Sequence, residues 1–76
     1  MNQKEIATRV RELREERRHS QEALSEALGI RQPAYSELER GHTKLTAERA
    51  LVLAEFYGIS VDELLRGERG AARMML

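Results

Sequence analysis

Apolar residues recur along this 76-residue chain at intervals of three and four positions, the spacing that places them on one face of an α-helix. No stretch shows the strict alternation that a half-buried strand would need. The pattern therefore predicts an all-α domain of five helices. The first spans roughly Gln3 to Arg17, and the other four lie between the residue pairs Ser20 and Gly29, Ile30 and Gly41, Thr46 and Gly58, and Ser60 and Gly67.

The second and third predicted helices form the most informative segment, which runs from Ser20 to Gly41. The Ser20 side chain can cap the first of them, and Gly29 suits a left-handed turn out of it. Two helices joined so closely must cross at a steep angle, which is the geometry of a helix-turn-helix. The second helix of such a pair can enter a DNA major groove. Their predicted buried residues are Leu24, Ala27 and Leu28, then Ile30, Ala34, Tyr35 and Leu38.

The last two helices carry clear start signals. Thr46 is a good N-cap, and Ser60 through Glu63 has the sequence of a capping box, with Ile59 and Leu64 placed as a hydrophobic staple. The fourth helix carries the apolar residues Ala50, Leu51, Leu53, Ala54 and Tyr57, and we expect Leu64 and Leu65 of the fifth to pack into the core.

Composition narrows the class of protein. A core this small is marginally stable, so dimerisation or close helix packing would help it. The chain has no cysteine and only two histidines, far apart in sequence, so we expect no disulfide, metal site or other cofactor. No apolar run has the length of a membrane span, and the amino terminus lacks the apolar region of a signal peptide. These features predict a cytoplasmic protein. No catalytic constellation or Gly-rich phosphate loop is found, so we expect no enzyme.

Charge is distributed unevenly although the net charge is zero. The first 20 residues carry six Lys/Arg against four Asp/Glu, whereas residues 21–45 carry three against four. The basic excess thus lies on the first helix and not on the predicted recognition helix. A neutral domain of this size should bind DNA weakly as a monomer, so two copies would be needed.

The chain resembles the small Cro/C1-type repressor domains, also called xenobiotic-response-element-like regulators, over about Ile6 to Gly67. The resemblance is carried by VRELREERR, SQEALSEALGI, SELERG and FYGISVDELL. It implies a five-helix, lambda-repressor-like bundle that binds pseudo-palindromic double-stranded DNA as a homodimer. It also implies one domain over residues 1–67, followed by a tail over 68–76. The family includes phage repressors, antitoxins and restriction-modification controllers, so the biological role stays open.

The recognition helix supplies the predicted contacts to bases, because its early, outward positions should face base edges. Gln32 is the strongest candidate, since its amide can both donate to and accept from the edge of adenine. Pro33 suits a thymine methyl group or serves only to start the helix, and Glu37 either accepts from cytosine or pairs with Arg31 or Arg40. The full predicted set is Arg31, Gln32, Pro33, Ser36 and Glu37.

Contacts to the DNA backbone are predicted around this helix. The resemblance implies that the Gln21 amide holds a phosphate, at a helix terminus whose free N–H groups also favour anions. It further implies a partly buried ion pair between Arg14 and Glu39, which would orient Arg14 toward the backbone. The predicted phosphate contacts are Gln21, Arg40, Thr43, Lys44 and Arg14. For the three residues after the helix, a solvated loop is the alternative.

A few positions depart from the family pattern. Arg18 replaces a frequent Gly at the end of the first helix, and His19 replaces an apolar residue that covers the core. Arg31 stands where Ser or Thr caps the recognition helix, and Leu45 where Pro is frequent. The tail ends in Met74, Met75 and Leu76, which either are disordered or pack across a dimer or onto a partner protein.

Two functions follow from these observations. The first is a sequence-specific regulator, a repressor that binds a pseudo-palindromic operator as a homodimer. The second is an antitoxin, which binds a toxin protein and represses its own operon through the same domain.

Overall fold

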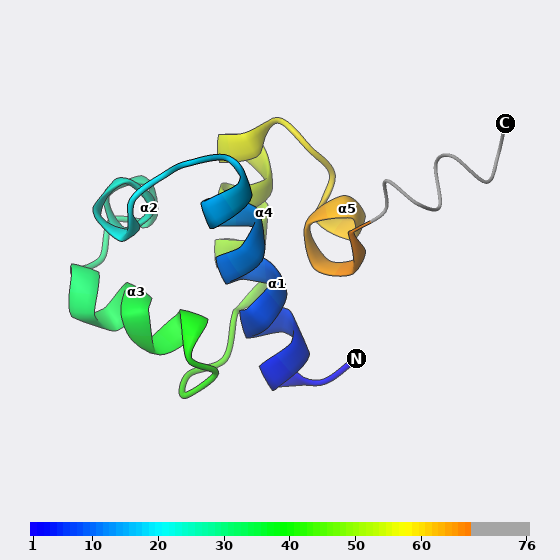
Figure 1. The fold of residues 1–76 in the computed structure, drawn as a ribbon, viewed down its shortest axis with the longest axis horizontal. Helices are drawn as coiled ribbons and strands as arrows, with labels where there is room; N and C mark the ends of the chain where they lie inside the picture. Colours follow the sequence, from blue (N-terminus) through cyan, green and yellow to red (C-terminus); the bar gives the residue numbers. More distant parts are fainter. Residues whose placement is uncertain (68–76) are drawn as a thin grey trace, which may run out of the picture.

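Five α-helices make up the part of the chain that the structure, a computed structural model, describes, which is residues 1–67 (Figure 1). This confirms the predicted all-α class and the predicted order of elements. The helices are α1 (Gln3–Glu16), α2 (Gln21–Leu28), α3 (Gln32–Glu39), α4 (Ala47–Tyr57) and α5 (Val61–Arg66).

The helices are arranged so that α2 and α3 lie together on one side of the domain and α5 lies on the other, with α1 and α4 between them (Figure 1). α2 packs against α3 and α4, while α1 packs against α3 and α5, and α4 against α5. Every helix therefore buries one face against at least two others, and the opposite faces of α2 and α3 stay open to solvent.

The core is a single apolar cluster to which all five helices contribute. Tyr35, Leu13, Leu24, Leu53 and Leu64 are its largest fully buried side chains. Ile6, Leu28, Ile30, Tyr57, Ile59 and Leu65 are partly buried and pack against it. At about 1.5–3 kcal/mol for each large apolar side chain removed from water, these few residues supply most of the driving force for folding.

Three alanine and leucine positions that the pattern placed among the apolar sets are instead exposed. Ala27 and Ala34 face solvent, and Leu51 is 55% exposed. Each lies beside a residue that does reach the core, and a short helix packed on one side can bury only a narrow stripe. For α3 the consequence is that residues 31–34 are all exposed, so its first turn stands clear of the domain.

Four of the five described helices, all but α3, have N-termini capped by short polar side chains. Ser20, Thr46 and Ser60 each accept a hydrogen bond from the N–H three residues later, at 3.0, 3.2 and 3.0 Å. At Ser60 the described contacts include only this half of the predicted capping box. A complete capping box forms instead at the start of α1, where Asn2 and Glu5 exchange side-chain to backbone bonds at 2.8 and 2.9 Å.

α1 ends at Glu16, one residue earlier than predicted, with Arg17 as its C-cap. Arg18 then takes φ 61°, and it is the one non-glycine residue of the described chain with positive φ. The His19 N–H bonds to the Arg14 carbonyl at 3.0 Å, which is the closing bond of a Schellman turn. The frequent glycine at this position thus corresponds to a left-handed turn that Arg18 must adopt at some cost.

Candidate DNA-binding surface

The turn between α2 and α3 sets the relative orientation of the two helices. Gly29 ends α2 with φ 70°, and the Ile30 N–H reaches back to the Ser25 carbonyl at 3.0 Å. Ile30 packs against the core immediately after this turn, and the chain changes direction between α2 and α3 within three residues (Figure 1). A side chain at Gly29 would meet no other atom within 4 Å, so the glycine is required by its backbone conformation alone.

The first turn of α3 presents most of the predicted base contacts. Arg31, Gln32 and Pro33 are exposed, and Ser36 one turn later is half-buried. Arg31 is the N-cap residue but makes no side-chain cap bond, so its guanidinium is not engaged at the helix start. Gln32, Pro33 and Ser36 line a shallow depression together with Gln21 of α2. The structure thus brings these side chains together on one open face.

The C-terminal end of the same helix is tied into the domain by a buried ion pair. Arg14 Nε donates to Glu39 Oε2 at 2.6 Å, and Arg14 Nη2 donates to Glu39 Oε1 at 3.1 Å. Gln21 Nε2 donates to the same Oε1 at 3.0 Å. The Glu39 side chain is only 2% exposed, and that of Arg14 is 13% exposed. α1, α2 and α3 are therefore joined at a single carboxylate.

Glu39 remains ionised despite its burial. Burial alone would raise its pKa, but the bonds from Arg14 and Gln21, with the Tyr35 hydroxyl nearby, outweigh that penalty and lower the pKa below its usual value. Tyr35 lies on the inner side, where burial raises the pKa of its phenol well above the ordinary value. Its hydroxyl is buried and makes no hydrogen bond of good geometry to residues 1–67. The carboxylate is thus the centre of the network.

Arg14 was given two predicted roles, and the structure favours the structural one. Besides its two bonds to Glu39, its Nη1 donates to the His19 carbonyl at 2.9 Å. Because all three nitrogens of the guanidinium have partners inside the domain, little of it faces solvent. Its direct contact with phosphate stays a prediction that the observed geometry does not support.

Gln21 makes a structural contact that the sequence did not indicate. Its amide nitrogen is used by Glu39, which orients the side chain at the N-terminus of α2. An amide NH₂ has two donors, so one remains for another partner. Gln21 also lines the shallow depression that it shares with Gln32, Pro33 and Ser36, so its predicted contact to phosphate is compatible with the observed geometry.

Glu37 pairs with residues at the end of α3 and not with Arg31. Its carboxylate lies 3.4 Å from Arg40 Nη1 and 2.9 Å from His42 Nδ1. The contact with His42 was not predicted. Gly41 takes φ 79°, and the His42 N–H bonds to the Glu37 carbonyl at 3.0 Å, which brings the ring back over the helix. The glycine after α3 was the signal, because a Schellman turn bonds the N–H of the residue directly after the glycine to a carbonyl of the last helical turn.

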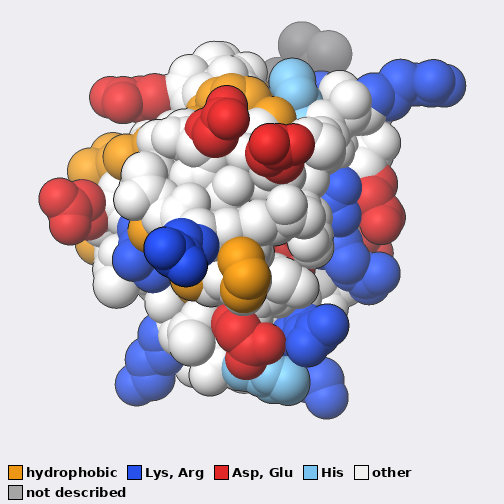
Figure 2. Space-filling model, turned by 90° about the vertical axis from the view of Figure 1, so that its left-hand side faces the viewer, with side chains coloured by type: hydrophobic (Ala, Val, Ile, Leu, Met, Phe, Trp, Pro, Cys, Tyr) orange, Lys and Arg blue, Asp and Glu red, His pale blue; other side chains and the backbone are white. Residues whose placement is uncertain are grey.

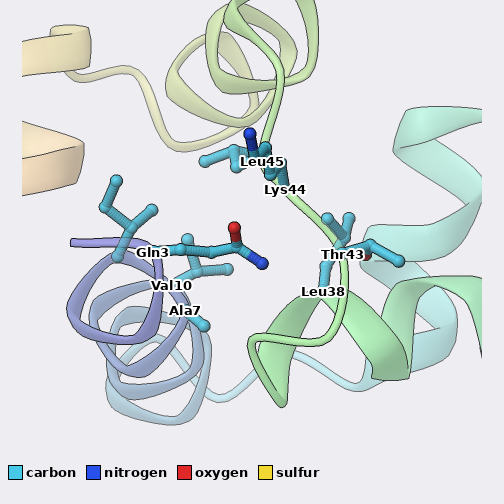
Figure 3. Close-up of a pocket in the computed structure, with 8 residues that line it drawn as sticks. Gln3, Ala7, Val10, Leu38, Thr43, Lys44 and Leu45 are labelled. Atoms are coloured by element: carbon cyan, nitrogen blue, oxygen red, sulfur yellow. The ribbon is translucent and has the colours of Figure 1, made fainter.

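The loop after α3 is anchored although its polar side chains are exposed. Gln3 Nε2 of α1 donates to the Gly41 carbonyl at 2.8 Å, and Leu45 packs against the core. Figure 3 shows the Gln3 side chain reaching from α1 toward this loop across a mostly apolar cavity of about 200 Å³. Thr43 and Lys44 lie at the edge of that cavity and remain exposed. The loop that carries Thr43 and Lys44, the two predicted phosphate contacts, is therefore anchored to the domain.

Charged side chains of both signs lie around the face formed by α2 and α3. In Figure 2, Lys and Arg side chains lie at its right and lower edges and one lies left of the centre, while acidic side chains lie at the top, at the sides and below the centre. A second depression on this side is lined by Arg11, Gln21, Ser36, Glu39, Arg40 and His42. A surface that carries uncharged polar side chains beside cationic ones can contact bases and phosphates together.

Among residues 1–67, no three His, Asp or Glu side chains are grouped as a metal ion would need. None of the described helices is long and apolar enough to cross a membrane. The predicted tail over 68–76 lies outside the described residues.

Comparisons with known proteins agree with this geometry. The sequence model of a protein family described as helix-turn-helix matches residues 10–64. The chain is also similar to the HTH-type transcriptional regulator DdrOP3 of Deinococcus deserti, with 42% identity over 62 residues. The match covers 82% of this chain and 48% of that protein, so the chain spans about half the length of this relative. No solved structure matches it.

Proposed function

The chain belongs to the helix-turn-helix family, and we propose that it is a sequence-specific DNA-binding transcriptional regulator. The observation that carries the proposal is the first turn of α3, which stands exposed while the far end of the helix is locked to α1 and α2 through Glu39. A helix held in this way can enter a major groove without rearranging the domain. The relative in Deinococcus deserti, named as a transcriptional regulator, supports the same role.

Specificity would come from α3 and affinity from its surroundings. Gln32 would contact adenine, with Arg31, Pro33, Ser36 and Glu37 beside it. Gln21, Arg40, Thr43 and Lys44 would hold phosphates, and Arg14 would act by fixing Glu39. Glu37 is already paired with Arg40 and His42, which offsets the repulsion that a free carboxylate would exert on DNA.

We further propose that the protein acts as a homodimeric repressor on a pseudo-palindromic operator. Because its proposed target is DNA, we propose that it works in the cytoplasm. The zero net charge supports a pair, because one neutral domain neutralises few phosphates. Two α3 helices would lie in successive major grooves about 10–10.5 base pairs apart. Residues 1–67 would form the DNA-binding unit, and the tail over 68–76 would serve contacts to a protein.

An antitoxin is the second candidate, and one surface supports a role in binding protein. An apolar groove is lined by Ile6, Leu45, Ala50, Leu51, Val61 and Leu65, with Leu51 largely exposed. Either a second copy or a toxin could cover it. A small reading frame beside the gene, whose product copurifies with this chain, would favour the antitoxin.

Selection of bound duplexes from a random library tests the proposal. We expect a motif with two-fold symmetry, and binding that weakens steeply with salt. Size-exclusion chromatography with light scattering, with and without the selected duplex, then shows the number of copies. If neither the upstream DNA of the gene nor a random duplex is bound at low salt, the proposal fails.

A further inference from the structure

His42 lies where its ring can face the DNA backbone. It follows Gly41 at the end of α3, its side chain is 59% exposed, and it lines the polar depression of the DNA-binding face. The other groups around this depression are Arg11 of α1, Gln21 of α2, Ser36 and Glu39 of α3, and Arg40 in the turn. Because Glu39 is occupied by Arg14 and Gln21, the depression offers an anion two guanidinium groups and several neutral donors.

The contact with Glu37 determines which ring nitrogen is free. An ionised carboxylate only accepts hydrogen bonds, so the 2.9 Å contact with Glu37 Oε1 places a proton on Nδ1 of His42. In the neutral imidazole, Nε2 then carries a lone pair and would repel a phosphate oxygen. In the protonated ring, Nε2 carries a hydrogen and can donate to that oxygen. Nε2 makes no hydrogen bond to residues 1–67, so it is available in both states.

Protonation also changes the local charge. Glu37 is balanced by Arg40 at 3.4 Å when His42 is neutral, so the three groups together are neutral. Adding a proton to His42 makes the cluster positive by one unit, at a position next to Arg40 and Arg11. The new hydrogen-bond donor at Nε2 and the added positive charge both strengthen the binding of phosphate.

We propose that His42 is a further phosphate-binding residue, and that it makes this contact only in its protonated form. The inference rests on the proposed DNA-binding function, which it deepens by making affinity depend on pH. Imidazole side chains as a class change their charge between about pH 5 and 8, which sets the range of pH for the test. Affinity for DNA would rise as the pH falls.

Fluorescence anisotropy with a labelled 30-base-pair duplex of mixed sequence, at low salt, tests the inference. A contact to phosphate does not depend on sequence, so the operator need not be known. For the natural chain we expect affinity to increase about threefold to tenfold between pH 8 and pH 6, since a charge-assisted bond is gained. The slope of log affinity against log salt should steepen by about 0.9 at pH 6, which corresponds to one more neutralised phosphate.

Two substitutions at the site have opposite expected results. His42→Gln keeps a donor for Glu37 but cannot be charged, so it should show the pH 8 affinity at both pH values. His42→Lys carries a permanent charge, so this variant should bind the duplex with the same affinity at pH 8 and at pH 6. His19→Gln is the matched control, because the chain has two histidines and His19 packs against Phe56, at 4.9 Å between ring centres. It should retain the natural pH dependence.

The outcomes separate this inference from the proposed function. If the natural chain binds no duplex at either pH, the proposed function itself fails. If it binds equally at both, or if His42→Gln keeps the increase, the role of His42 is wrong. An NMR titration of the natural chain checks the result without a variant: tighter binding of the protonated form requires DNA to raise the midpoint of the His42 titration. A midpoint that DNA leaves unchanged overturns the inference.

Discussion

The two ends of α3 differ although they belong to one helix of eight residues. At the first turn, Arg31, Gln32 and Pro33 are exposed and make no contact that fixes the domain. At the last turn, Leu38 and Glu39 are buried, and Glu39 is bonded to α1 and α2. The comparison shows how a small domain can present free side chains on a rigid support. The end that contacts the core fixes the orientation, and the other end is left for a partner.

The largest expected effect on stability comes from removing Glu39 at the buried end of α3. Glu39→Ala leaves Arg14 buried without its carboxylate and removes the acceptor of Gln21. We expect a loss of about 3–5 kcal/mol in the free energy of unfolding, because an uncompensated buried charge remains. Urea denaturation followed by circular dichroism measures it.

The double variant Arg14→Met with Glu39→Leu is the control for this prediction, since it removes both charges and keeps apolar volume. It should recover much of the lost stability. A loss in Glu39→Ala below about 1 kcal/mol, the range of an exposed pair, would show that the buried network does not hold α3.

Acid should also destabilise the domain through Glu39, but by less than the substitution Glu39→Ala does. The pKa of Glu39 is lowered in the folded chain, so the unfolded chain binds its proton more readily. The stabilisation is therefore complete above the pKa of the unfolded state, about 4.3, and is lost as the pH falls through the lower folded value. Urea midpoints between pH 7 and pH 3 measure this loss. It should be smaller in Glu39→Gln, whose amide does not titrate, and an identical loss in both proteins would contradict the assignment.

At the exposed end, substitution should change DNA binding and leave folding intact. Gln32→Ala removes the side chain predicted to contact adenine, so we expect a cost of roughly 1–3 kcal/mol in binding to the selected operator and a relaxed preference at one base pair per half-site. Its unfolding midpoint should equal that of the natural chain, since Gln32 is exposed. If all duplexes lose affinity equally, Gln32 contacts the backbone and not a base.

The smallest effect belongs to the loop that follows α3. Lys44 is exposed, and the loop that carries it is anchored by the packing of Leu45 against the core. Lys44→Ala should weaken binding to all duplexes alike and reduce the salt slope by about 1, because one phosphate contact is lost. Glu48→Ala, at an exposed position of α4, is the matched control for a surface charge. A sequence-dependent loss in Lys44→Ala would contradict the phosphate assignment.

Much of the fold was predictable because its signals are local. Ser20, Thr46 and Ser60 cap the helices that they were expected to cap, and Gly29 and Gly58 end helices in the left-handed conformation. The exposure of Ala34 was not predictable in this way, because alanine fits either side of a helix and only packing decides between them. The exposure of Leu51 was not predictable from the pattern either, because the residue lines an open apolar groove that only the packing of the helices creates.

The class of fold, the order of the five helices and the segment that forms the helix-turn-helix could all be predicted, since they depend on periodicity and on capping residues a few positions apart. Further contacts between polar groups became visible only once the helices were packed together. Gln21 joins the pair of Arg14 and Glu39, and His42 turns back onto Glu37. Such contacts depend on the angle at which helices cross and on the path of a turn, which are set by the packing of the whole core and not by any local pattern.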